Sequence, residues 1–167
     1  MNIRVDFIDV DDMSCRVAGF LSRYRAVHVG LRFGDHYLLP TATGKSQWMT
    51  ATTVERFLKG KIVHSFDICP DPDNFNPELT IKVGEGHVMS SLLWRLLTEW
   101  PHYFYDSGFR MYRPKRTNCV FVITSLLSTM GITTTTSTPY FLWKELTLLS
   151  LTMGSGILPH DPRPHTE

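Results

Sequence analysis

The sequence predicts an α+β domain, in which a small, mainly antiparallel sheet from the first half of the chain packs against helices from the second half. Strand-like segments with alternating or β-branched residues fill residues 3–68, whereas apolar residues at helical spacing dominate residues 88–152. The chain has 167 residues, of which 43% are hydrophobic, so it can bury one sizeable core. We therefore expect a single domain over residues 1–150, followed by a polar, proline-rich tail over residues 151–167.

Four to five strands account for the predicted sheet. Residues 3–10 alternate between apolar and polar side chains, which is typical of a half-buried strand. Residues 26–33 and 36–39 flank the turn signal Gly34–Asp35 and predict a hairpin. Residues 61–68 read as a further strand, and residues 46–49 offer a short one.

The predicted helices carry recognisable start and stop signals. Polar residues at 11–14 can cap a short helix, and a helix over residues 54–59 ends at Gly60. Residues 88–100 have leucines at helical spacing, residues 118–130 form an apolar helix that ends at Gly131, and a last helix starts at Pro139. Residues 69–77 are rich in proline and acidic residues and predict a loop, while the threonine tract 133–138 predicts a solvent loop or an edge strand.

Charge and hydropathy exclude several classes of protein. With 17 basic and 16 acidic residues the net charge is +1, so we expect no nucleic-acid partner, whose phosphates require clustered cations. No apolar run approaches the roughly 18 residues that span a bilayer, and the strand-like start of the sequence does not resemble a signal peptide. The three cysteines cannot form a complete disulfide framework, which indicates a reducing compartment such as the cytoplasm.

One cysteine and one histidine are the candidates for chemistry. Cys119 starts the predicted helix 118–130, where the positive end of the helix dipole and free backbone N–H groups favour a thiolate and can hold an oxyanion. His28 lies within a strand, which would hold an imidazole rigidly enough to act as a general base. The alternatives are an ordinary buried cysteine and a half-buried structural histidine.

Short motifs around these two residues resemble the circularly permuted papain-like proteins of the NlpC type. Residues 27–34 (VHVGLRFG) resemble the histidine strand of these proteins, residues 118–122 (NCVFV) resemble their cysteine helix, and residues 138–142 (TPYFL) resemble a helix start that often follows. The resemblance spans residues 3–146. It implies a permuted papain-like fold and a thiol hydrolase with Cys119 as nucleophile and His28 as base. Such proteins cleave peptide or amide bonds, often in peptidoglycan, and one branch moves acyl groups on lipids.

The same resemblance gives expectations for the substrate. A peptide or amide substrate would bind beside the thiol, with Asn118, Arg113 and Arg116 as the expected binding residues. The two arginines belong to the basic cluster 113–116, which could recognise an anionic group or simply form a solvated loop. No cofactor is expected, and the sequence contains no CxxC or HExxH pattern that would predict a metal site.

The sequence departs from this family at the residue that orients the histidine. Papain-like proteins of this type place a polar or acidic residue on the returning strand, whereas here the matching position falls near Pro40. Thr41 is the expected substitute, with Thr43 and His36 as alternatives. The departure keeps a second hypothesis open, in which a catalytically degenerate domain serves as a structural or binding component of a larger assembly such as a virion. In that case the protein subunits of the assembly, as in a phage, are the partners and the location is virion-associated.

Overall fold

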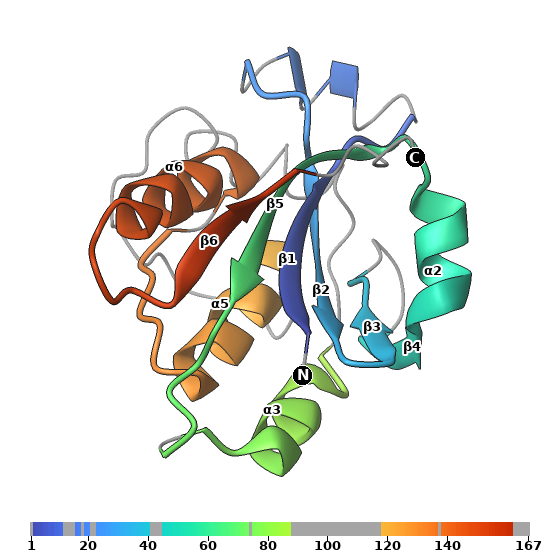
Figure 1. Ribbon diagram of the computed structural model, residues 1–167. Helices are drawn as coiled ribbons and strands as arrows, with labels where there is room; N and C mark the ends of the chain where they lie inside the picture. The colour runs from blue at the N-terminus through green and yellow to red at the C-terminus, as the bar shows by residue number, and fades with distance from the viewer. Residues whose placement is uncertain are drawn as a thin grey trace, which may run out of the picture.

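The computed structural model is an α+β fold with a six-stranded antiparallel sheet (Figure 1). It describes residues 2–11, 16–17, 19–20, 23–40, 45–73, 75–87, 118–136 and 138–161. The strand order is β4-β3-β2-β1-β5-β6, and each neighbouring pair is antiparallel. The strands are β1 (Ile3–Ile8), β2 (His28–Phe33), β3 (His36–Leu38), β4 (Trp48–Thr50), β5 (Ile62–Ile68) and β6 (Ile157–His160). The predicted α+β class with a mainly antiparallel sheet and the β2–β3 hairpin are confirmed.

Four helices accompany the sheet in the described part of the chain: α2 (Ala51–Leu58), α3 (Pro77–Gly84), α5 (Cys119–Thr129) and α6 (Pro139–Ser150). Three of them begin with a polar cap, because the side chains of Asn76, Asn118 and Thr138 each accept a hydrogen bond from the backbone three residues later. Proline stands in the first turn of α3 and α6, where its missing N–H costs nothing. Helices α5 and α6 were predicted, over residues 118–130 and from Pro139, whereas α3 was not, because its first residue ends the proline-rich stretch that predicted a loop.

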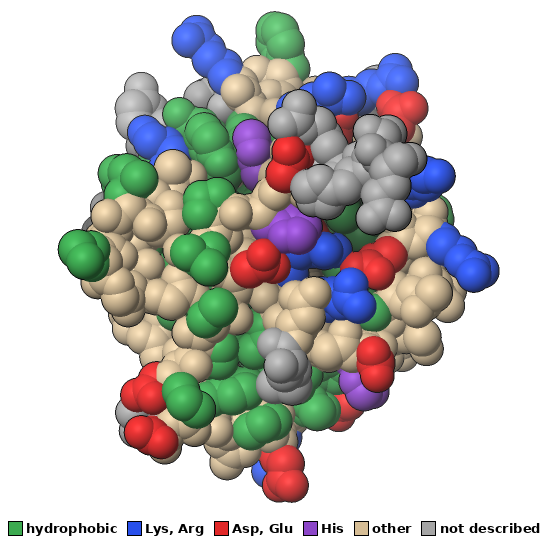
Figure 2. All heavy atoms as spheres, viewed as in Figure 1, with side chains coloured by type: hydrophobic (Ala, Val, Ile, Leu, Met, Phe, Trp, Pro, Cys, Tyr) green, Lys and Arg blue, Asp and Glu red, His purple; other side chains and the backbone are tan. Residues whose placement is uncertain are grey.

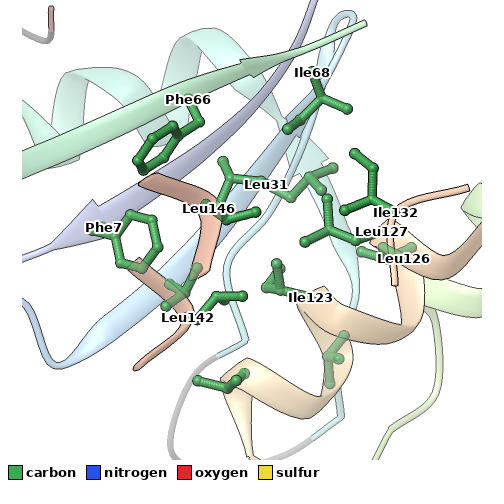
Figure 3. Packing of buried hydrophobic residues seen from close by; sticks show 14 of the residues in the cluster. Phe7, Leu31, Phe66, Ile68, Ile123, Leu126, Leu127, Ile132, Leu142 and Leu146 are labelled. Carbon is green, nitrogen blue, oxygen red and sulfur yellow. The ribbon is translucent and has the colours of Figure 1, made fainter. Parts of the chain in front are cut away.

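The two faces of the sheet have different neighbours. Val5, Phe7, Val29 and Leu31 alternate onto one face and join the main core with α5 and α6, which lie behind the sheet in Figure 1. Figure 3 shows strand residues of this face, such as Phe7, meeting leucines and isoleucines of the two helices. The opposite face carries a smaller cluster under α2: Ile8, Tyr37, Ala51, Val54 and Leu58. The sheet therefore separates a helix-covered face from a face that only α2 covers in the described chain.

The domain extends beyond the predicted boundary at residue 150. Residues 157–160 form β6, which pairs with β5 in the register Ile68↔Ile157 to Ser65↔His160. The side chain of Ile157 is only 1% exposed and belongs to the main core. The prediction of a loose tail from residue 151 was wrong here, because one buried isoleucine and backbone pairing are enough to add a short edge strand.

Other predicted elements have mixed outcomes. The threonine tract lies outside helices and strands at residues 133–136, so it forms the loop and not the edge strand. Residues 16–17 and 19–20 are helical, in agreement with a short helix there. The helix predicted over residues 88–100 lies outside the described residues.

An aromatic stack on the helix-covered face contains the half-buried His64. Its ring stacks on Trp143 of α6 at 5.0 Å between centroids, and Tyr24 stacks parallel to it at 6.1 Å. Burial lowers the pKa of His64 below its ordinary value of 6.5. The folded state therefore binds this proton less readily than the unfolded chain does.

This shift predicts an acid-dependent loss of stability. A histidine with a lowered pKa stabilises the fold fully above the unfolded value of 6.5, and the contribution is lost as the pH falls from there toward the folded pKa. We expect the melting temperature of the wild type to fall between pH 7 and pH 5 by more than that of His64→Phe, which keeps a ring in the stack. Parallel melting curves that stay the same distance apart across this range would contradict the prediction.

Candidate functional site

Cys119 is the first residue of α5 and lies inside the core. Its side chain is 2% exposed and belongs to the same buried cluster as Val29 and Leu31 of β2. The preceding Asn118 caps the helix, because its side-chain oxygen accepts a hydrogen bond from Phe121 N–H at 2.7 Å. The predicted helix-start cysteine is confirmed in position, and it is both near the positive end of a helix and shielded from solvent.

His28 lies on the other face of the sheet. It is the first residue of β2 and stands opposite Ile8 of β1, while the next pair in the register is Phe7↔Val29. Residues directly opposite each other in an antiparallel pair point to the same face, so His28 shares the face of Ile8, which packs under α2. Val29, which packs in the cluster of Cys119, points the other way. The structure therefore does not bring the thiol and the imidazole together.

The remaining predicted site residues fall into two groups. Thr41, Thr43, Arg113 and Arg116 lie outside the described residues, so their predicted roles stay predictions. His36 is the first residue of β3 and lies opposite Phe33, the last residue of β2, whereas His28 is the first residue of β2. Five residues of extended strand span roughly 17 Å, which is too far for His36 to orient His28.

A polar network that sequence reasoning missed lies on the same face as His28. Its centre is the carboxylate of Asp6, which is 0% exposed in the middle of β1. Three side chains from three strands donate hydrogen bonds to it: Arg4 Nε at 2.8 Å, Tyr37 Oη at 2.7 Å and Ser65 Oγ at 2.6 Å. Burial, reinforced by the charge of Asp6, raises the pKa of Tyr37, so its phenol remains protonated and serves as a donor.

The network continues from the sheet to helix α2. One carboxylate oxygen of Glu55 accepts hydrogen bonds from Arg4 Nη2 at 2.8 Å and from Arg32 Nη1 at 2.6 Å. Glu55 therefore joins α2 to strands β1 and β2 through two charge-assisted hydrogen bonds. Each of the two arginines in this network meets a carboxylate, which leaves the network balanced in charge.

A further polar contact lies along the same face. Asp67 of β5 contacts His160 of β6 at 2.9 Å, and both side chains are about one-third exposed. Figure 2 shows charged and histidine side chains gathered around a shallow hollow in the middle of this face. The face of His28 is therefore polar and partly open to solvent, whereas the face of Cys119 is apolar and closed by helices.

The sequence did contain a signal for this network. Arg4 and Asp6 alternate with the apolar residues of β1, and Arg32 alternates with those of β2, so all three occupy the second face of their strands. That pattern alone does not reveal that α2 covers them and buries Asp6. The network has a structural role, because its hydrogen-bond donors and acceptors are paired with one another. Within the described residues, no group of three or more histidine, cysteine or acidic side chains is arranged to hold a metal ion.

Comparison with models of protein families, with curated proteins and with solved structures finds no match for this chain. Among the residues that the structure describes, no helix has the length and apolar character needed to cross a bilayer.

Proposed function

We propose that this chain is a binding or structural component of a larger assembly, built on a papain-like domain that has lost its thiol–imidazole pair. The observation that carries the proposal is the strand register, which directs His28 away from the face on which Cys119 packs. A cysteine hydrolase needs a base within hydrogen-bond reach of the thiol, directly or through one water. Because the sheet lies between the two side chains, the thiol and the imidazole cannot make this contact.

Two further observations support the loss of catalysis. Cys119 is 2% exposed, so a substrate carbonyl has no direct access to its sulfur. Pro40, which takes the position of the orienting residue in the resemblance, has no side-chain acceptor to hold a histidine. Relative to a working triad, the nucleophile is buried, its base faces the other side of the sheet, and a proline takes the sequence position of the orienting residue.

A thiol hydrolase that cleaves a peptide or amide bond is the second candidate function. It is favoured by the position of Cys119 at the start of a well-capped helix, where backbone N–H groups can stabilise both a thiolate and an oxyanion. In this hypothesis a base other than His28 in its present position must receive the thiol proton. Its substrate would lie on the helix-covered face of the sheet.

Alkylation of the thiol by iodoacetamide separates the two functions. The variant to use carries Cys15→Ser and Cys69→Ser, so that Cys119 is the one reactive thiol, and mass spectrometry follows its modification between pH 6 and pH 9. We expect Cys119 in the folded protein to react more slowly than glutathione at each pH, and we expect His28→Ala to leave the rate unchanged. In urea the same thiol should react at the rate of an unfolded cysteine, which controls for its chemical competence.

Two results would contradict the binding component. Fast alkylation at pH 6 that disappears in His28→Ala would establish the thiol–imidazole pair and with it the hydrolase. Fast alkylation at pH 6 that His28→Ala does not change would establish an activated thiol with a different base, which again favours the hydrolase.

A further inference from the structure

An exposed apolar patch lies at the turn between α6 and β6. Residues 147–159 contain no charged side chain. Four large apolar side chains of this stretch are exposed: Leu148 by 66%, Leu151 by 78%, Met153 by 99% and Leu158 by 57%. The left part of Figure 2, over α6 and β6, shows hydrophobic and uncharged side chains accordingly. Clustered exposure of this kind marks interaction surfaces, whereas isolated exposed leucines do not.

The turn that presents this patch is held by hydrogen bonds of its own backbone. Leu151 N–H donates to Leu148 C=O, Thr152 N–H to Leu149 C=O, and Ser155 N–H to Thr152 C=O. The end of the turn is fixed to β5, because Cys69 N–H donates to Gly156 C=O at 2.7 Å. A surface that is ordered before binding loses little conformational entropy when a partner covers it.

The patch combines a protruding side chain with a hollow. Met153 lines a mainly apolar depression of about 370 Å³ together with residues that include Leu151, Ile157 and Leu158. The depression has ample volume for one methionine side chain, and methionine adapts its shape to irregular apolar hollows. An exposed side chain at the rim of such a depression allows an isologous contact, in which two identical patches fill one another.

We propose that this patch binds a second copy of the same chain across a twofold axis, with Met153 of each copy in the depression of the other. A patch without charge can face its own copy without electrostatic repulsion. Its four exposed side chains present several hundred Å² of apolar surface, of the same order as the roughly 800 Å² that each partner buries in a standard interface. The proposal rests on the proposed function as a component of an assembly, and it identifies a second copy of the chain as one partner in that assembly.

Side-chain packing, and not strand addition, forms this contact. β6 lies at one edge of the sheet. Cys69 and Gly156 are opposite each other and hydrogen-bonded, and in an antiparallel ladder every second residue pair after them is hydrogen-bonded as well. Pro159, three residues after Gly156, therefore directs its backbone nitrogen to the outer edge, where it has no N–H to donate. A second strand could not pair regularly with this edge.

The test measures the mass of the full chain in solution by light scattering and by sedimentation over a wide range of micromolar concentrations. We expect a monomer–dimer equilibrium for the wild type. Met153→Glu and Leu151→Glu should each raise the dissociation constant about tenfold or more, because they place a carboxylate in a desolvated apolar contact. Phe57→Glu is the matched control: Phe57 is 64% exposed on α2, far from the patch, and its replacement should leave the equilibrium unchanged.

Three results would overturn the proposal. If the wild type is monomeric at every concentration, the patch does not bind a second copy of the chain. Association that survives both Met153→Glu and Leu151→Glu assigns the contact to a different surface. Binding of a monomeric wild type to phosphatidylcholine vesicles, lost in the same variants, assigns the patch to a lipid surface. None of these results depends on the reactivity of Cys119, so this proposal and the proposed function fail separately.

Discussion

Replacement of Asp6 by alanine is expected to lower the free energy of unfolding by about 3–5 kcal/mol, because it removes the buried acceptor of three side chains and leaves Glu55 as the anionic partner of Arg4. Arg4, Tyr37 and Ser65 each donate a hydrogen bond to this carboxylate, and Asp6 itself is 0% exposed. After the substitution the two hydroxyl groups have no acceptor at that position, and burial of unsatisfied donors is costly. Urea unfolding followed by circular dichroism gives the difference directly.

A surface aspartate provides the control for this prediction. Asp11 accepts a hydrogen bond from Arg16, and their side chains are 75% and 68% exposed. Asp11→Ala should therefore change the free energy of unfolding by less than about 1 kcal/mol. If Asp6→Ala lowered the free energy of unfolding no more than Asp11→Ala does, the network would not stabilise the fold as its short distances indicate.

Gly156→Ala is expected to destabilise the protein by about 2–5 kcal/mol, because it combines backbone strain with a steric clash. Gly156 has φ = +67°, a conformation that costs energy for a residue with a Cβ atom. A Cβ atom at this position would lie 2.4 Å from the backbone carbonyl oxygen of Cys69, which directly follows β5 and cannot move freely. We expect the alanine to separate β6 from β5 at its start.

Gly154→Ala separates the two contributions. Gly154 has φ = +79°, but an added Cβ atom would meet nothing within 4 Å. This variant should lose only about 1–2 kcal/mol, the cost of the left-handed conformation alone. Thermal or urea unfolding of the two variants side by side would contradict the steric argument if their losses were equal.

Local signals predicted the elements whose determinants are neighbours in sequence. The Gly34–Asp35 turn predicted the β2–β3 hairpin, Gly131 predicted the end of α5, and Pro139 predicted the start of α6. These features depend on hydrogen bonds that span at most four residues, so they can be read from a short window. Strand β6 lacks such a signal, since its place in the sheet depends on pairing with residues 65–68.

The candidate site was predicted in part, and the missing part has a physical reason. Alternation with Val27, Val29 and Leu31 indicates that His28 lies on the other side of its strand from these apolar residues. The sequence does not reveal which face of the sheet the helix of Cys119 covers, because that depends on packing between distant segments. The structure places that helix on the apolar side, so the two residues suggested by the family motifs lie on opposite faces.

The position of β6 also has a consequence for how the protein is made. The hydrogen bond between Asp67 and His160 joins residues 93 positions apart, and β6 pairs with β5 along the same stretch. During synthesis the outer edge of β5 therefore stays unpaired until residue 160 has left the ribosome. Unpaired strand edges of this kind are where nascent chains aggregate. A chain truncated before this point would form an aggregation-prone intermediate with strands β1 to β5 and an unpaired edge, which we expect chaperones to bind.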